Sequence, residues 1–152
     1  MQILIEDNME IKIKKLSEGA VIPTYGSEYS AGADLYALAD EPIVIEPGKT
    51  VLVHTGISIE IPEGYGGFIY ARSGLSTKRG LAPANKVGVI DSDYRGEIMV
   101  SLYNQSGVTQ TVESKERIAQ LVIAPFLKAE FVLSNDLSET ERGVGGFGST
   151  GK

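Results

Sequence analysis

The sequence contains no cysteine, no tryptophan and a single histidine, His54. Without cysteine no disulfide bond can form, which agrees with a reducing compartment but does not require one. His54 falls on the outer face of an expected strand, with no acidic residue at the short spacing of a metal site. The sequence therefore predicts that His54 is a surface side chain and not a metal ligand.

Positive charge and long apolar runs are also scarce. The 14 Lys and Arg residues are outnumbered by 20 Asp and Glu residues, for a formal net charge of −6. This balance argues against general binding to nucleic acid or to anionic membranes, so a polyanionic ligand must meet a local basic site. No stretch approaches the roughly 18 apolar residues of a membrane span, and residues 1–7 do not resemble a signal peptide. We expect a cytoplasmic protein without nucleic-acid or membrane partners.

Glycine, by contrast, is abundant, with 18 residues beside 6 prolines, and short runs of valine, isoleucine and threonine separate the turns. A chain of 152 residues fits one domain, which we expect to span residues 1–152. Apolar runs and alternation predict strands at residues 11–16, 43–45, 50–61, 66–71, 87–90, 98–102, 108–112, 118–126 and 130–133, and one more ending near residue 37. Short, closely spaced strands indicate an all-β domain, a distorted jelly roll or a barrel-like fold.

Two glycines mark expected boundaries. Gly56 interrupts the alternation of residues 50–61 and predicts a bulge or bend there. Ser73 and Gly80 are expected to cap and to end the one short helix of the domain.

A polar turn containing Asp91, Asp93, Tyr94 and Arg95 lies between the apolar runs at residues 87–90 and 98–102. This pattern predicts a β-hairpin in which Asp91 stands where strand becomes turn. An aspartate is ionised at neutral pH, and it can act as a general base when a water lies within hydrogen-bond reach. The alternative is that Asp91 and Asp93 only bond to turn backbone, as aspartates commonly do.

Three other places carry groups suited to phosphate or metal. Arg72, Ser73 and Gly74 offer a guanidinium, a hydroxyl and backbone N–H groups at the expected helix start. Gln120 is a lone polar side chain in an apolar strand and can position water or phosphate, while Asp34 can hold a metal-bound water. Their structural alternatives are an ordinary helix cap, a solvent-facing amide and a turn brace.

The last stretch, residues 134–152, is glycine-rich and has too few apolar residues to build a core, so it predicts a mobile arm. Its glycines match two phosphate-binding patterns, but both patterns need a following helix, and we reject them. Arg142, Ser149 and Thr150 still supply phosphate donors, and Phe147 is suited to stacking on a base. The alternative is a disordered tail with one stray aromatic.

Taken together, residues 31–37, 71–76, 88–97, 116–121 and 142–151 resemble the five ordered motifs of the trimeric dUTP diphosphatase (dUTPase) family. The resemblance leaves out only about the first ten residues. It implies a distorted jelly-roll fold, a homotrimer whose active sites are shared between subunits, and Mg²⁺-dependent hydrolysis of dUTP to dUMP and pyrophosphate. That reaction limits uracil incorporation into DNA and supplies dUMP for dTMP synthesis.

The resemblance also implies roles for individual residues. Asp91 activates the water that attacks the α-phosphorus, and Asp34 contacts Mg²⁺ through water. The phosphates are held by Arg72, Ser73, Gly74, Gln120, Arg142, Gly148, Ser149 and Thr150. Uracil and deoxyribose are held by Asn85, Gly88, Val89, Ile90, Tyr94, Met99 and Phe147. Two rival functions stay open: a related fold that deaminates dCTP, and a nucleotide-sensing module without catalysis.

Overall fold

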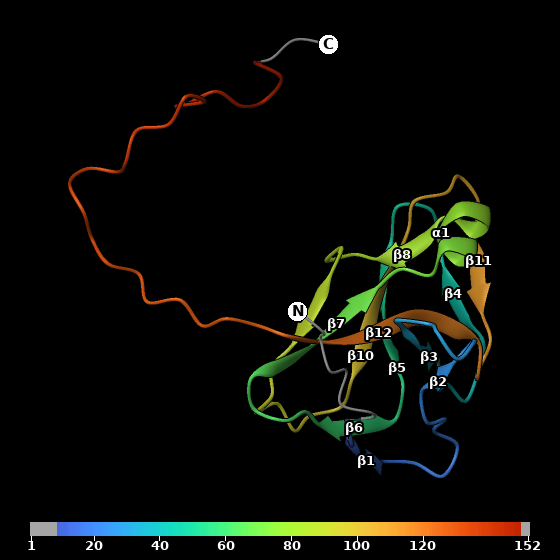
Figure 1. The fold of residues 1–152 in the computed structure, drawn as a ribbon. Coiled ribbons are helices and arrows are strands. Elements are labelled where there is room, and N and C mark those ends of the chain that lie inside the picture. Colours follow the sequence, from blue (N-terminus) through green and yellow to red (C-terminus); the bar gives the residue numbers. More distant parts are fainter. Residues whose placement is uncertain (1–8, 150–152) are drawn as a thin grey trace.

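The computed structural model describes residues 9–149, which form short strands, one helix and a long C-terminal arm (Figure 1). The all-β prediction with a single short helix is confirmed for this part of the chain, and the fold is jelly-roll-like. Every strand pairing within it is antiparallel, and the strands are divided among four sheets rather than closed into a barrel. None of its helices is long and apolar enough to cross a membrane.

The largest sheet has five strands. Their order is β2 (Thr24–Tyr25), β3 (Ala33–Tyr36), β12 (Arg117–Pro125), β7 (Tyr65–Tyr70) and β9 (Gly88–Ile90). In its register Gln120 of β12 lies opposite Asp34 on one side and Tyr70 on the other. Because directly opposed residues project from the same face of a sheet, these three side chains form one row.

The predicted hairpin over residues 87–102 is wrong. The first apolar run becomes β9, which pairs with β7, whereas the second becomes β10 (Met99–Asn104), which pairs with β5 (Thr50–His54) and β8 (Leu81–Pro83) in another sheet. The predicted alternation of the second run is confirmed, since Val100 and Leu102 are buried and Met99 and Ser101 are only half-buried. The turn after Ile90 therefore links two sheets, and each of its ends is fixed by different neighbours.

Gly56 divides the pattern predicted as one strand into two strands of different sheets. It has φ +69° and separates β5 from β6 (Ile57–Glu60), which pairs with β1 (Lys12–Lys15). A Cβ at this position would lie 2.4 Å from Leu38 Cδ2, so both the backbone conformation and the space require glycine. The predicted bend at Gly56 is confirmed.

The remaining sheet pairs β4 (Ile43–Ile45) with β11 (Gln110–Val112), and it lies close to the helix α1 (Ser73–Arg79) in Figure 1. Gly80 ends α1 in the left-handed conformation, as predicted. The predicted cap at Ser73 is wrong, because Ser73 is the first helical residue and Arg72, the N-cap, makes no side-chain capping bond. Leu75 is the buried residue of α1 and anchors the helix to the core.

The core lies between the sheets and consists almost entirely of aliphatic side chains. Leu35, Ile45, Val53, Leu102 and Ile118 are among those with no more than 1% exposure. Truncating such a residue to alanine typically costs about 2–5 kcal/mol, since the lost burial is joined by a cavity. The folded domain is therefore stabilised by buried side chains from several sheets.

After β12 the chain leaves the body as an extended arm (Figure 1). The strand predicted at residues 130–133 is wrong: no regular structure occurs between Phe126 and Ser149, and Phe131 and Leu133 are almost fully exposed. Strand formation needs a neighbouring strand for its hydrogen bonds, and this segment has none within residues 9–149 of its own chain. The mobility of residues 134–152 stays a prediction.

Candidate active site

A cavity of about 530 Å³ lies on the outer face of the five-stranded sheet, next to the start of α1. We call it the arginine pocket. Its walls are Gly26, Ser30, Ala31, Gly32, Asp34, Tyr70, Arg72, Ser73, Gly74, Arg117, Gln120 and Val122. The arginine pocket thus brings together five residues assigned to phosphate and metal from the sequence, which come from three separate stretches of chain: Asp34, Arg72–Gly74 and Gln120.

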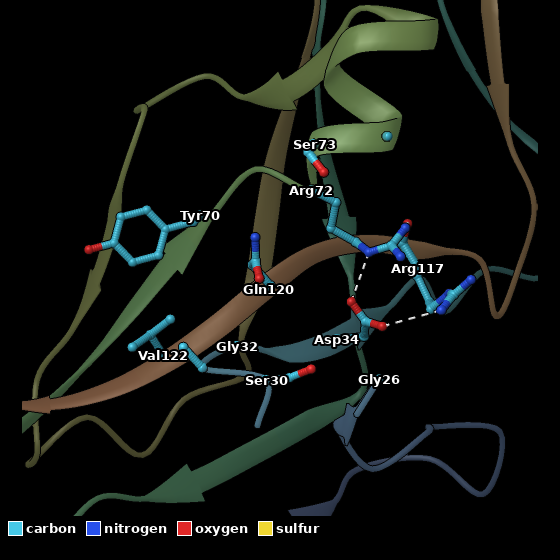
Figure 2. Close-up of a pocket in the computed structure, with 12 residues that line it drawn as sticks. Gly26, Ser30, Gly32, Asp34, Tyr70, Arg72, Ser73, Arg117, Gln120 and Val122 are labelled. Carbon is cyan, nitrogen blue, oxygen red and sulfur yellow. Dashed lines mark hydrogen bonds and ion pairs between the residues drawn. The ribbon is translucent and has the colours of Figure 1, made fainter. Parts of the chain in front are cut away.

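Asp34 of the arginine pocket is bonded to two guanidinium groups, those of Arg72 and Arg117 (Figure 2). Arg72 Nε donates to Asp34 Oδ1 at 2.7 Å, and Arg117 Nη1 donates to Oδ2 at 3.4 Å. The two guanidinium groups carry two positive charges and the Asp34 carboxylate one negative charge, so one positive charge in this group of three remains unbalanced. Sequence reasoning gave Arg117 no role, and the only signal for it was its position inside the motif at residues 116–121.

The arginine pocket offers few side-chain ligands for a magnesium ion. No group of three or more His, Asp or Glu side chains suited to a metal occurs among residues 9–149. Mg²⁺ commonly keeps several waters and is held through one or two carboxylates together with substrate phosphates. A carboxylate has about four acceptor positions, so Asp34 can accept a metal-bound water beside its two arginines. The residues fit a metal that arrives with the nucleotide.

Gln120 and the helix start complete the arginine pocket. Gln120 Nε2 donates to the carbonyl of Ala71 at 2.9 Å, which fixes the amide at the floor of the pocket. Ser73 and Gly74 lie exposed at the rim, in the first turn of α1. The first N–H groups of a helix have no partner within the helix, so the rim can donate to an anion. The pocket therefore combines cations, an amide and backbone donors, which suits phosphate oxygens.

A second cavity, of about 260 Å³, lies beside β9 and the following turn, and we call it the base pocket. Its walls are Leu52, Ile69, Asn85, Gly88, Val89, Ile90, Asp91, Tyr94, Glu97, Ile98 and Met99. Except for Phe147, every residue assigned to uracil and deoxyribose from the sequence is present there, together with Asp91. The two pockets have no wall residue in common, and adjacent residues of β7, Ile69 and Tyr70, line different ones.

Asp91 is the first residue after β9, and its side chain is exposed. The turn that follows is closed by backbone and arginine bonds: Tyr94 N donates to Asp91 O at 3.1 Å, and Arg95 Nη1 donates to Ser92 O at 2.6 Å. Within residues 9–149 neither the Asp91 nor the Asp93 carboxylate makes a hydrogen bond, which does not support the purely structural alternative for them. The Asp91 carboxylate is open to water on the rim of the base pocket.

Tyr94 is held against its own turn. Its hydroxyl donates to the carbonyl of Glu97 at 2.9 Å, and its ring lies over Gly96, where an added Cβ would be 2.4 Å from the hydroxyl oxygen. Gly96 is thus needed because a side chain would occupy the space of the ring. The result is an aromatic wall in a defined position at the mouth of the base pocket.

Glu97 is a wall residue that sequence reasoning did not single out. Its Oε1 accepts from the N–H of Gly56 at 2.8 Å, and its Oε2 lies 2.9 Å from His54 Nδ1. Burial raises the pKa of Glu97, but the bonds from His54 and from the Gly56 backbone, with the charge of His54, outweigh that effect and lower the pKa below its usual value. These partners are 41 and 43 residues away in sequence, so no local motif could reveal them.

The arm residues do not reach either pocket of their own chain. Phe147 is fully exposed with φ +52°, and Arg142 Nε donates to the carbonyl of Gly145 at 2.8 Å within the arm itself. Gly148 and Ser149 are also exposed, and Thr150 lies outside the described residues. The arm extends away from the body after β12 (Figure 1). The four described arm residues are therefore separated from the sites assigned to them.

The chain is similar to known proteins over nearly its whole length. The deoxyuridine 5′-triphosphate nucleotidohydrolase of Nautilia profundicola is 50% identical over 95% of this chain and 100% of its own, and that of Desulfitobacterium hafniense is 53% identical over 86% and 87%. The solved structure of the Staphylococcus bacteriophage 80alpha dUTPase with dUPNHPP superposes with a TM-score of 0.86 at 29% identity, over 95% of this chain and 100% of that chain. A family model described as dUTPase matches residues 18–151, and the chain belongs to the dUTPase family of nucleotide hydrolases.

Proposed function

We propose that this dUTPase cleaves dUTP between the α- and β-phosphates, with Asp91 as the general base. The observation that supports this assignment is the position of Asp91. This exposed residue lines the base pocket together with the residues that we assign to uracil and deoxyribose. Asp91 takes a proton from a water, whose oxygen bonds to the α-phosphorus. The bond from this phosphorus to the bridging oxygen breaks, and pyrophosphate leaves with the electron pair. The products are dUMP and pyrophosphate, and the reaction keeps dUTP out of DNA while supplying dUMP for dTMP synthesis.

The base pocket would hold the nucleoside. Asn85 and the backbone of residues 88–90 supply donors and acceptors for uracil, and Tyr94 packs against deoxyribose where a ribose 2′-hydroxyl would need space. A pocket that hydrogen-bonds its ligand rejects a mismatched base strongly, whereas a single added methyl is usually worth only about 1–3 kcal/mol. Gly88 allows the backbone to form a close wall, since a Cβ there would already lie 3.3–3.4 Å from Ile69 and Asn85.

The arginine pocket would hold the triphosphate. Phosphoryl transfer asks a protein mainly for positioning and charge neutralisation. Arg72, Arg117 and the donors of Ser73, Gly74 and Gln120 meet that need, and a Mg²⁺ ion bound with the nucleotide would neutralise further phosphate charge, with Asp34 reaching it through water.

A homotrimer with shared active sites is the assembly we propose. Three observations support it: the base pocket and the arginine pocket have no common wall, the arm leaves its own body, and residues 126–133 expose Leu127, Phe131 and Leu133. Exposed apolar segments of this kind mark interaction sites. In such a trimer, one subunit offers the base pocket, a second the arginine pocket, and a third the arm with Arg142, Phe147, Gly148, Ser149 and Thr150. We place its action in the cytoplasm.

The test is pyrophosphate release with Mg²⁺ from dUTP, dTTP, dCTP and UTP side by side, with identification of the nucleotide product. We expect dUMP from dUTP and little turnover of the other three. The Asp91→Asn variant should bind dUTP without turning it over, and unchanged turnover would contradict the general-base role. Release of ammonia from dCTP would favour the deaminase alternative, and binding of dUTP without hydrolysis by the wild-type protein would favour a sensor.

A further inference from the structure

Glu97 ties the catalytic turn to a different part of the fold. Both of its carboxylate oxygens point to the bend between β5 and β6, where Oε1 accepts from Gly56 N at 2.8 Å and Oε2 meets His54 Nδ1 at 2.9 Å. We call Glu97, His54 and Gly56 the carboxylate clamp. Its glutamate side chain is 22% exposed and its histidine 58% exposed, so the bond to the backbone is the better protected of the two.

The clamp acts on the turn rather than on the strand that follows. Ile98 is already fixed by the backbone, because its N–H donates to Ile57 O at 2.8 Å and its carbonyl accepts from the Thr55 hydroxyl. Glu97 itself has no such backbone bond within residues 9–149; its carbonyl accepts the Tyr94 hydroxyl at 2.9 Å. Removing the Glu97 carboxylate therefore releases the residue that holds Tyr94, while β10 keeps its place.

The position of the Tyr94 ring depends on the hydrogen bond from its hydroxyl to the Glu97 carbonyl. Its hydroxyl is bonded to Glu97, its ring covers Gly96, and it lies at the exposed mouth of the base pocket. A shift of the Glu97 carbonyl moves the hydroxyl anchor of the ring. Because Asp91 stands at the other end of the turn, directly after β9, such a shift leaves the general base supported by the five-stranded sheet.

We propose that Glu97, held by His54 and by the Gly56 N–H, is a positioning residue that sets the Tyr94 ring against the sugar and so determines how strongly the enzyme prefers deoxyribose to ribose. This inference rests on the proposed role of Tyr94 in sugar recognition. Discrimination by a rigid wall depends on sub-ångström placement, and the clamp supplies that rigidity from side chains that do not themselves touch the substrate's reacting atoms.

The experiment measures kcat and KM for dUTP and for UTP in the wild-type enzyme and in the Glu97→Ala, Glu97→Gln, His54→Ala and Tyr94→Phe variants. Glu97→Ala should lower the ratio of kcat/KM for dUTP over UTP about tenfold, the effect of losing one charge-assisted hydrogen bond. The kcat for dUTP should fall much less. Glu97→Gln should restore most of the ratio, because its amide oxygen still accepts from Gly56 N. His54→Ala should give a smaller loss, and the exposed Glu46, which lines neither pocket, provides the control Glu46→Ala.

A double variant separates positioning from a general loss of structure. If Glu97 acts through Tyr94, the ratio in Glu97→Ala/Tyr94→Phe should be no lower than in the worse single variant, since coupled residues are not additive. Multiplying effects, or an unchanged ratio in Glu97→Ala, would overturn the proposal. Should Glu97→Ala not fold, an unchanged ratio in both His54→Ala and Tyr94→Phe overturns it instead. Failure of the proposed function looks different, because the wild-type enzyme itself would then not hydrolyse dUTP or not distinguish it from UTP.

Discussion

Gln120 occupies the space that any side chain on Gly32 would need: a Cβ added to Gly32 would lie 2.3 Å from Gln120 Oε1. The amide is also bonded to the carbonyl of Ala71. Gly32 therefore keeps Gln120 in place at the floor of the arginine pocket.

This contact predicts the effect of Gly32→Ala. The new methyl group should push Gln120 off the Ala71 carbonyl and raise KM for dUTP by about tenfold, since one hydrogen bond to a charged phosphate is worth roughly 1.5–3 kcal/mol. Steady-state kinetics would measure the change. Gly107→Ala is the matched control, because an added Cβ there has no heavy atom within 4 Å. An unchanged KM in Gly32→Ala would show that Gln120 does not contact the phosphates.

Arg117 should matter for binding and not only for orienting Asp34. Arg117→Gln removes one cation from the arginine pocket, and we expect KM for dUTP to rise about tenfold with a smaller loss of kcat. The rise should shrink at high salt, because Arg117 is half exposed and its interaction is screened. Lys14→Gln, on the exposed strand β1, tests for a general effect of charge. Equal KM values for Arg117→Gln and Lys14→Gln would contradict the role.

The proposed trimer with shared active sites predicts complementation between inactive variants. Asp91→Asn and Arg72→Ala should each be almost inactive as homotrimers. Co-refolded in equal amounts, they should form mixed trimers in which about a quarter of the sites combine an intact Asp91 from one subunit with an intact Arg72 from another. Activity recovered after mixing would be measured as pyrophosphate release. Persistent inactivity of the mixture, with trimers seen by light scattering, would place both residues of a site on one subunit.

The arm should be dispensable for folding and required for turnover. A chain ending at Leu133 loses residues that are mostly exposed in the described part of the arm and make no contribution to the core. We expect its thermal unfolding midpoint to match that of the full chain, and its kcat/KM for dUTP to fall by at least about a hundredfold, since the arm supplies phosphate donors and the Phe147 ring in the trimer that we propose. Full activity of the shortened enzyme would remove the arm from the site.

The carboxylate clamp predicts a pH-dependent contribution to stability. The pKa of Glu97 is lowered in the folded protein. Its contribution is therefore present above the unfolded pKa, near 4.5, and is lost as the pH falls through the lower folded pKa. Glu97→Gln should be less stable than the wild type by about 1 kcal/mol at pH 7, and the difference should shrink in acid. Urea unfolding at several pH values measures it, with Glu46→Gln as the control. A difference that does not change with pH would contradict the charge effect.

The strands and their boundaries were largely predictable because they depend on local patterns. Alternation in residues 98–102 predicted which side chains of β10 are buried, and Gly56 and Gly80 marked a bend and a helix end through their special conformations. Strand pairing was not predictable in the same way. Two apolar runs around a turn look like a hairpin, but β9 pairs with β7, and β10 pairs with β5 and β8, so neither run pairs with the other.

The candidate site follows the same division. Residues inside compact motifs, such as Arg72 and Asp91, were singled out from the sequence, whereas Glu97 acquires its role only through His54 and Gly56, which folding brings next to it. The apolar run at residues 130–133 has the composition of a strand, yet it remains unpaired within the described part of its own chain. The composition of a segment indicates a preference for strand structure, but a strand forms only where a neighbouring strand can pair with it.

The alternation of Ile69 and Tyr70 on β7 has a consequence for how this enzyme can change over evolution. One residue serves the base pocket and the next serves the arginine pocket. A single inserted or deleted residue in β7 would exchange their faces and damage both pockets at once. Length variation among descendants of this gene should therefore accumulate in exposed turns such as residues 63–64, while β7 keeps its length even as its side chains vary.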